Sequence, residues 1–300
     1  MLPIAFHPIY KHPLPEGHKF PMLKYELLPQ QLLLEGIAEE SDFFAPEPAE
    51  LQHVYAIHDK EYVNSLLNLT LDAKAQRKIG FPLSAELIER ELRIAQGTIS
   101  GCEKAFETGV AFNIAGGTHH AFTNLGEGFC MLNDQAIAAN YLLDQKLASK
   151  ILIIDLDVHQ GNGTAEIFQN NSNVFTFSVH GQTNYPFKKE VSDLDIGLPN
   201  GTADDEYLKI VKEYVPQLIN REKPDFIFYL SGVDILESDK LGNLSVSVEG
   251  CKKRDEIVLS NCKKFQIPVQ VSMGGGYSPE IKIIIAAHTN TYRVGADLFS

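Results

Sequence analysis

The sequence predicts an α/β protein whose parallel, doubly wound sheet is flanked by helices on both faces. Short apolar segments alternate with longer amphipathic ones along most of the chain, as they do in βαβ units. No internal repeat, low-complexity tract or linker interrupts the 300 residues, and 44% hydrophobic with 22% charged residues is typical of a globular core. We therefore expect a single domain that spans residues 1–300.

The first third of the chain predicts an extended segment followed by helices. Residues 1–24 contain five prolines and three histidines, and because proline disfavours helix we expect an exposed, extended segment there. Helices are expected at 26–40 and at 60–69. A longer helix should begin after Ser84, a good N-cap, and Gly97 and Gly101 would let it pack closely against a neighbour.

The remaining two thirds alternate regularly between strands and helices. The expected strands are VAFNIAGG, ILIIDLD, VFTFSVH, DFIFYLSG and IPVQVSMGGG. Helices are expected near 134–147, 163–170, 203–221 and 245–264, and a last one after Pro279. Ligands of parallel α/β sheets bind beyond the carboxyl ends of the strands, so the residues that follow each apolar run are the candidate site residues.

Composition and charge exclude several classes of protein. A net charge of -13 argues against direct nucleic-acid binding and weakly favours cationic partners. The four cysteines form no CxxC pair, which indicates reduced thiols. The N-terminus has no signal pattern and no apolar run approaches the roughly 20 residues that a membrane helix needs, so we expect a cytoplasmic protein without membrane attachment.

The segment ILIIDLDVHQGNG carries the first candidate site. Side chains alternate along a strand, so Asp155, Asp157 and His159 should face one way while Leu156 and Val158 face the other. Three polar groups on one side of an apolar element are costly to bury unless they share a partner, and a divalent cation is such a partner. The alternative interpretation is a strand that simply ends in water.

Asp234 lies at the corresponding end of another expected strand, in FIFYLSGVD. Together with Asp157 and His159 it would form a three-ligand site with one open position, which is the arrangement of a catalytic zinc. Two carboxylates and an imidazole would also suit Fe²⁺, Co²⁺ or Mn²⁺, so the residues leave the metal open.

Two histidines in tandem, His119 and His120, follow the strand VAFNIAGG. One imidazole can take a proton from water while the other stabilises developing charge. Each needs an acceptor on its far nitrogen, and Asp155 and Asn162 are available for that. The alternative is a pair of hydrogen-bonded core histidines.

Tyr277 follows three consecutive glycines, Gly274 to Gly276. Glycines permit backbone conformations that would let the phenol lean over a site and donate a hydrogen bond to a developing oxyanion. A glycine-rich phosphate cradle is the competing interpretation, but the Lys-Ser/Thr pair that it requires does not follow.

Taken together, these motifs resemble the zinc-dependent histone deacetylase and acetoin-utilisation family, which has the arginase/deacetylase-like fold. The resemblance is carried by HPLPEGHKFPMLKY, IHDKEYV, GGTHHAFTNLGEGFC, IDLDVHQGNGTAEIF, SGVD and GGGY. It is greatest to the small, single-domain, class IV-like members. It implies a metal-dependent amidohydrolase that removes acetyl or longer acyl groups from the lysines of proteins or from related alkyl-amines. Water activated at the metal would attack the amide.

The resemblance also implies a role for each site residue. The implied metal ligands are Asp157, His159 and Asp234; the general base and acid is His120, with Asn162 behind it; its electrostatic companion is His119, paired with Asp155; and the group that polarises the carbonyl is Tyr277. The implied acyl-lysine tunnel is formed by Gly128, Phe129 and Tyr185, with Phe187 as the rival to Tyr185. The implied structural potassium ion is held around Asp155, Asp157, His159, Ser178 and Val179.

Two features depart from the family pattern. Asn162 stands where many members have aspartate, so His120 should hold its proton less firmly. No residue, Asp72 included, is identified as the rim carboxylate that grips the substrate backbone in many members.

The alternatives to a protein deacetylase are an acetylpolyamine deacetylase, a D-x-D phosphatase, an arginase-like ureohydrolase with paired Mn²⁺, and a non-enzymatic acyl-lysine binder. The substrate and the oligomeric state stay open.

Overall fold

The structure, a computed structural model, describes all 300 residues, and its centre is one parallel sheet. Eight strands pair in the order β2-β1-β3-β8-β7-β4-β5-β6. Their bounds are β1 Ile4–Ala5, β2 Phe43–Phe44, β3 Val110–Asn113, β4 Ile151–Asp155, β5 Val174–Gly181, β6 Leu194–Leu198, β7 Phe226–Leu230 and β8 Val269–Ser272. The strands β3, β4, β7 and β8 are buried along their whole length, because helices cover both faces. The predicted α/β fold is confirmed.

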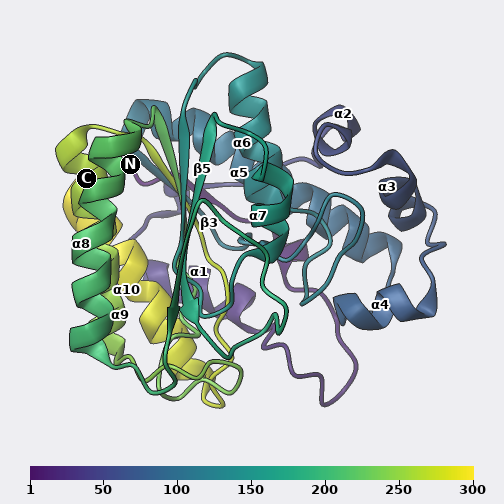
Figure 1. Cartoon of the computed structure of the whole chain (residues 1–300). Helices are drawn as coiled ribbons and strands as arrows, with labels where there is room; N and C mark the ends of the chain where they lie inside the picture. The colour runs from purple at the N-terminus through teal and green to yellow at the C-terminus, as the bar shows by residue number, and fades with distance from the viewer.

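Two helical layers enclose this sheet (Figure 1). One layer contains α1, α8, α9 and α10, which pack side by side, and the other contains α5, α6 and α7. The short helices α2, α3 and α4 lie outside the second layer. The bounds are α1 Lys24–Leu34, α2 Leu51–Tyr55, α3 Lys60–Leu67, α4 Ala73–Ile79, α5 Ala85–Thr108, α6 Asp134–Asp144, α7 Asn162–Phe168, α8 Asp204–Glu222, α9 Val248–Phe265 and α10 Ile281–Phe299.

Helix α5 follows the sequence prediction closely. The Ser84 hydroxyl caps it by accepting the Leu87 N–H at 3.1 Å. A Cβ on Gly97 would lie 2.7 Å from the Tyr10 hydroxyl, so glycine is needed for this close approach. Gly101 is less constrained, because its nearest neighbour would be 3.4 Å away.

The N-terminal segment differs from the prediction of an exposed, extended chain. Ile4 and Ala5 form strand β1 inside the sheet, paired with β2 on one side and β3 on the other. Tyr10 and Lys24 are also fully buried. The prolines exclude regular helix as expected, but they do not prevent a two-residue strand or the short 3₁₀ turn Pro8–Tyr10.

The first predicted helix is shorter than expected, and several short elements were not predicted. Helix α1 ends at Leu34 rather than residue 40, because Gly36 adopts a left-handed conformation with φ of 65°. Strands β1 and β2 and helix α2 have too few residues to produce a periodic pattern. Strand β6, LDIGL, is mostly not buried and has no apolar run, and helix α4, AKAQRKI, buries only Ile79.

Two further observations bear on the sequence predictions. All four cysteines are buried and unpaired. No helix combines the length and the apolar character that crossing a bilayer would require.

Candidate active site

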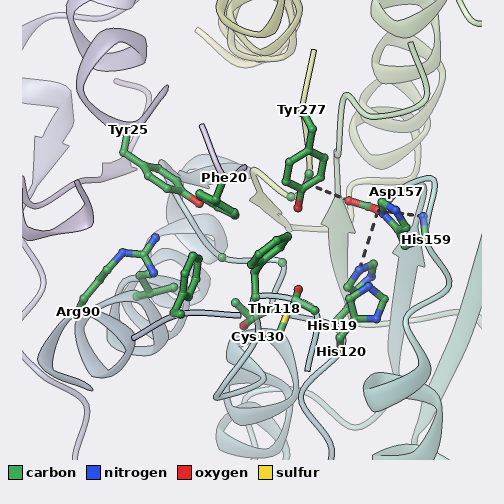
Figure 2. A pocket seen from close by; sticks show the side chains of 18 residues that line it. Phe20, Tyr25, Arg90, Thr118, His119, His120, Cys130, Asp157, His159 and Tyr277 are labelled. Carbon is green, nitrogen blue, oxygen red and sulfur yellow. Dashed lines mark hydrogen bonds and ion pairs between the residues drawn. The ribbon is translucent and has the colours of Figure 1, made fainter. Parts of the chain in front are cut away.

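The candidate residues gather at the carboxyl edge of the central strands. His119 and His120 follow β3, and Asp155 ends β4 with Asp157 and His159 just after it. Asp234 follows β7 and Tyr277 follows β8. Figure 2 shows His119, His120, Asp157, His159 and Tyr277 around one cavity. This convergence follows from the parallel sheet, because parallel strands end at the same edge.

Three of these side chains form a buried cluster with possible metal ligands. One ligand atom from each of Asp157, His159 and Asp234 lies within 4.8 Å of the others. Strand β4 ends at Asp155, so strand alternation does not explain this cluster. Instead, Asp155 Oδ1 accepts the Asp157 N–H at 3.1 Å and Asp157 Oδ1 accepts the His159 N–H at 3.0 Å. These two side-chain-to-backbone hydrogen bonds bend the chain after β4, so that the side chains of Asp157 and His159 lie beside Asp234.

The cluster has the properties of a cation site. His159 Nδ1 lies 3.1 Å from Asp234 Oδ2, yet no hydrogen bond of good geometry reaches this fully buried oxygen. Burial, together with the charge of Asp157, raises the pKa of Asp234 to about 7. A Cβ on Gly275 would lie 2.0 Å from Asp234 Oδ2, so only glycine leaves this space open. An unpaired buried oxygen beside a second carboxylate and an imidazole fits a divalent cation.

The tandem histidines have different partners. His119 Nδ1 lies 2.7 Å from Asp155 Oδ2, and His120 Nδ1 lies 2.7 Å from Asn162 Oδ1. Burial alone would lower the pKa of His119, but the Asp155 carboxylate outweighs it and raises that pKa. Burial and the neighbouring His119 hold the pKa of His120 well below its ordinary value. His119 is therefore suited to carry positive charge, and His120 is suited to stay neutral and act as a base.

A carboxylate at the start of helix α6 holds the turn that presents these histidines. Asp134 Oδ1 accepts the N–H groups of Gly117 and Thr118, both at 2.9 Å. Its second oxygen accepts the Thr98 hydroxyl at 2.7 Å.

Tyr277 is fixed through its backbone and through its ring. Asp239 Oδ2 accepts the Tyr277 N–H at 2.6 Å. The buried Lys24 donates to the Gly274 carbonyl at 3.1 Å, and its Nζ lies 5.5 Å from the centre of the Tyr277 ring. Burial raises the pKa of Tyr277 well above its ordinary value, so its hydroxyl remains a hydrogen-bond donor.

Two cavities lie beside the cluster, and both are lined by His120, His159 and Tyr277. The outer cavity, about 550 Å³, is lined by Phe129 and Tyr185 and reaches His120, His159 and Tyr277. A Cβ on Gly128 would lie 2.7 Å from the His120 ring, so glycine lets the chain pass close to it. The inner cavity is small, about 40 Å³, and is lined in part by Asp157 and His159 of the cluster. Its further lining residues include Phe20, Tyr25, Phe81 and Arg90.

Tyr185 and its rival Phe187 occupy different environments. The Tyr185 ring packs edge-to-face on His120 with centroids 5.1 Å apart. Phe187 is 91% exposed, although it also lines the outer cavity. The tunnel assignment therefore favours Tyr185.

The residues of the implied potassium site lie on adjacent strands. Asp155 of β4 and Ser178 of β5 are register partners, and Val179 follows Ser178. Asp157 and His159 lie in the loop that continues from β4. The structure thus brings these residues to the ends of two adjacent strands, β4 and β5, and to the loop that follows β4.

Sequence reasoning missed four polar residues that support the site, namely Lys24, Glu127, Asp134 and Asp239. Three of them act on backbone groups that lie far away in sequence, and no motif marks such contacts. Only Lys24 and Glu127 carried a signal, because they stand in the quoted stretches HPLPEGHKFPMLKY and GEGFC.

Comparison with known proteins identifies the family. Residues 18–292 match the histone deacetylase domain. The chain belongs to the histone deacetylase family. Its relatives include an uncharacterised protein from Picosynechococcus, 43% identical over 99% of both chains. Histone deacetylase 2 of Arabidopsis thaliana is 29% identical over 90% of this chain and 72% of its own length.

Further family members support the same assignment. A probable deacetylase of Archaeoglobus fulgidus is 31% identical, over 92% of this chain and 81% of its own length. Among solved structures, a histone deacetylase homologue from Aquifex aeolicus superposes with a TM-score of 0.83 at 25% identity, covering 97% of this chain and 82% of that one. A histone deacetylase homologue complexed with SAHA also gives a TM-score of 0.83 at 25% identity, covering 98% and 84%. These likenesses confirm the arginase/deacetylase-like fold and support a deacetylase activity.

Proposed function

We propose that this chain is a zinc-dependent deacylase that hydrolyses the amide of an acylated lysine side chain or a related acylated alkyl-amine, with residues 1–300 acting as one catalytic domain. The observation that carries the proposal is the convergence of Asp157, His159 and Asp234 beside His120 and Tyr277 at one cavity. Membership of the histone deacetylase family supports the reaction class.

Asp157, His159 and Asp234 would hold the metal. A Zn²⁺ ion bound there would supply Lewis acidity, which would polarise the carbonyl and lower the pKa of water toward ~7. Fe²⁺, Co²⁺ or Mn²⁺ could take the same ligands. A cation bound by the cluster would compensate the charge of Asp157 and Asp234, which would explain why both carboxylates are completely buried.

His120 performs the proton transfers. Its Nδ1–H donates to Asn162, which leaves Nε2 free to accept a proton from the attacking water. The same nitrogen then donates that proton to the departing amine, which is necessary because an unprotonated amide nitrogen leaves poorly. His119, paired with Asp155, stays positively charged and stabilises the negative charge that develops.

Tyr277 stabilises the oxygen of the tetrahedral intermediate. Its hydroxyl remains protonated because burial raises its pKa, so it can donate a hydrogen bond to that oxygen. Phe129 and Tyr185 would flank the alkyl chain of the substrate in the outer cavity, with Gly128 making room beside His120.

A structural potassium ion would be held around Asp155, Asp157, His159, Ser178 and Val179. The substrates would be acylated proteins or acylated amines in the cytoplasm, with no direct role for nucleic acid or membrane.

The test is hydrolysis of a panel of lysine peptides carrying acyl chains of increasing length, with N-acetylputrescine as the polyamine substrate. The zinc-loaded protein should release the acid from at least one of them, and a hydroxamate should inhibit it. Lack of turnover on every amide, combined with turnover of a chromogenic phosphate ester, would instead support the D-x-D phosphatase.

A further inference from the structure

Glu127 lies behind Asn162, on the side away from His120. Its side chain is buried, and Glu127 Oε1 accepts a hydrogen bond from Asn162 Nδ2 at 2.8 Å. Glu127 Oε2 lies 2.8 Å from Lys78 Nζ, and the Tyr185 hydroxyl also donates to this carboxylate. All three partners are side chains, and each of them either lines the outer cavity or contacts His120.

The chemistry of a carboxylate decides how Asn162 is oriented. An ionised carboxylate can only accept hydrogen bonds, whereas an amide side chain presents an acceptor on one side and donors on the other. Because Glu127 takes the NH₂ of Asn162, the amide oxygen must face His120. That oxygen in turn can only accept, so His120 must carry its proton on Nδ1.

We infer that Glu127 is a positioning residue that sets the tautomer of His120 through Asn162, so that Nε2 is unprotonated and available as the base. This inference rests on the proposed function for its catalytic consequence. An asparagine alone could rotate by 180° and donate to Nδ1, which would place the imidazole proton on Nε2 and block the base. Glu127 removes that alternative.

The surroundings keep Glu127 in the ionised form that this role requires. Burial would raise its pKa, but hydrogen bonds from Lys78, Tyr185 and Asn162 outweigh burial and lower the pKa below its ordinary value. Lys78 is half exposed on α4, so its ammonium links the buried carboxylate to the mouth of the outer cavity. Tyr185 links the same carboxylate to the tunnel wall.

The first test is Glu127→Gln, which preserves shape but can present a donor to Asn162. We expect kcat to fall on the order of 10- to 100-fold with KM changed less than about threefold, because the wrong tautomer impairs proton transfer rather than binding. Histidine ¹⁵N NMR of the zinc-loaded protein should show His120 moving from the Nδ1–H form to a mixture of tautomers.

The matched control is Glu166→Gln, since Glu166 is a partly buried carboxylate on α7 that accepts from Thr123 but not from Asn162. This control should retain wild-type kcat and the wild-type tautomer.

A reciprocal exchange tests the pair directly. Asn162→Asp alone places two carboxylates against each other and should lower kcat at least as much as Glu127→Gln. In the double variant Asn162→Asp with Glu127→Gln, the carboxylate introduced at position 162 accepts from His120 Nδ1–H. The NH₂ group introduced at position 127 donates to that carboxylate, and the amide oxygen at position 127 can still accept from Lys78. The double variant should therefore recover kcat to within about fivefold of wild type.

Two results would overturn the inference: an unchanged tautomer and kcat in Glu127→Gln, or a double variant no more active than Asn162→Asp. If wild-type protein hydrolyses no acylated amine, the proposed function fails. The NMR comparison of wild type with Glu127→Gln still decides the role of Glu127 in that case.

Discussion

At the scale of single residues, burial moves the pKa of two proposed catalytic groups in opposite directions. Burial keeps Tyr277 protonated by raising its pKa and keeps His120 neutral by lowering its pKa. One group is thereby an available donor and the other an available base at the same pH. Exposed side chains of the same types would not be separated in this way.

Tyr277→Phe removes the hydroxyl and keeps the ring that packs on Phe20. Loss of an oxyanion donor should lower kcat on the order of 10²–10³-fold, while KM and the unfolding midpoint stay close to wild type. Steady-state kinetics on the best acyl-lysine substrate measures this. A decrease in kcat of less than about threefold would show that Tyr277 only lines the cavity and does not act as an oxyanion donor.

Asp234→Ala removes one proposed metal ligand. Metal analysis after dialysis should show less than a tenth of the wild-type zinc, and turnover should be abolished. The matched control is Asp225→Ala at the opposite end of the same strand, where the carboxylate accepts from Ser149 and Lys150. The control should keep its metal, and full activity of Asp234→Ala would contradict the ligand assignment.

At the scale of the elements, the sequence predicted an element where it forms a clear apolar run or is followed by polar site residues. Apolar runs predicted β3, β4, β5, β7 and β8, and polar residues after four of them marked the site. The two-residue strands β1 and β2 have no period to detect. The support that Lys24, Glu127 and Asp239 give the site depends on contacts between distant segments, which a single sequence does not reveal.

The close packing of α5 on the N-terminal segment predicts a contrast between two glycines on one helix. Gly97→Ala should destabilise the protein by about 1–2 kcal/mol, because the new Cβ would overlap the Tyr10 hydroxyl. Gly101→Ala should be neutral or stabilise by up to about 1 kcal/mol, since alanine favours helix and meets only ordinary contacts there. Urea unfolding of both variants measures the difference. Equal effects would show that α5 does not depend on this approach.

His58 joins the segment before α3 to the start of α6 and predicts a dependence of stability on pH. One ring nitrogen lies 2.9 Å from the Phe122 carbonyl oxygen, and the other accepts the Asn133 N–H at 3.0 Å. Burial lowers the pKa of His58 from 6.5 to about 4, despite hydrogen bonds to the backbone and the nearby Asp59. The unfolded chain therefore takes up a proton first as the pH falls.

The stability that neutral His58 provides is complete above pH 6.5 and decreases as the pH falls toward 4. His58→Gln, which can make both hydrogen bonds but does not titrate, should show a smaller loss of unfolding free energy between pH 7 and about 4.5. Chemical denaturation at several pH values measures it. Parallel pH profiles for the two proteins would rule out this contribution.

At the scale of the whole molecule, the proposed metal would link the segments that follow β4 and β7. Both carboxylate ligands and His159 follow these two central strands, and the unfolded chain lacks the arrangement. Zinc at about 100 times its dissociation constant should therefore stabilise the protein by about 2.7 kcal/mol. Calorimetry with and without zinc should show the higher unfolding temperature for the loaded protein and no shift for Asp234→Ala. An equal shift in that variant would place the zinc elsewhere.

The order of the strands has a consequence for the newly made polypeptide. Strand β8 lies between β3 and β7, although it is the last strand to leave the ribosome. Until β8 pairs, no strand lies between β3 and β7. Tyr277, which follows β8, therefore cannot yet approach His119 and His120, which are synthesised more than a hundred residues earlier. A chain that ends before β8 therefore lacks the arrangement of Tyr277 with His119 and His120 on which the proposed deacylase activity depends.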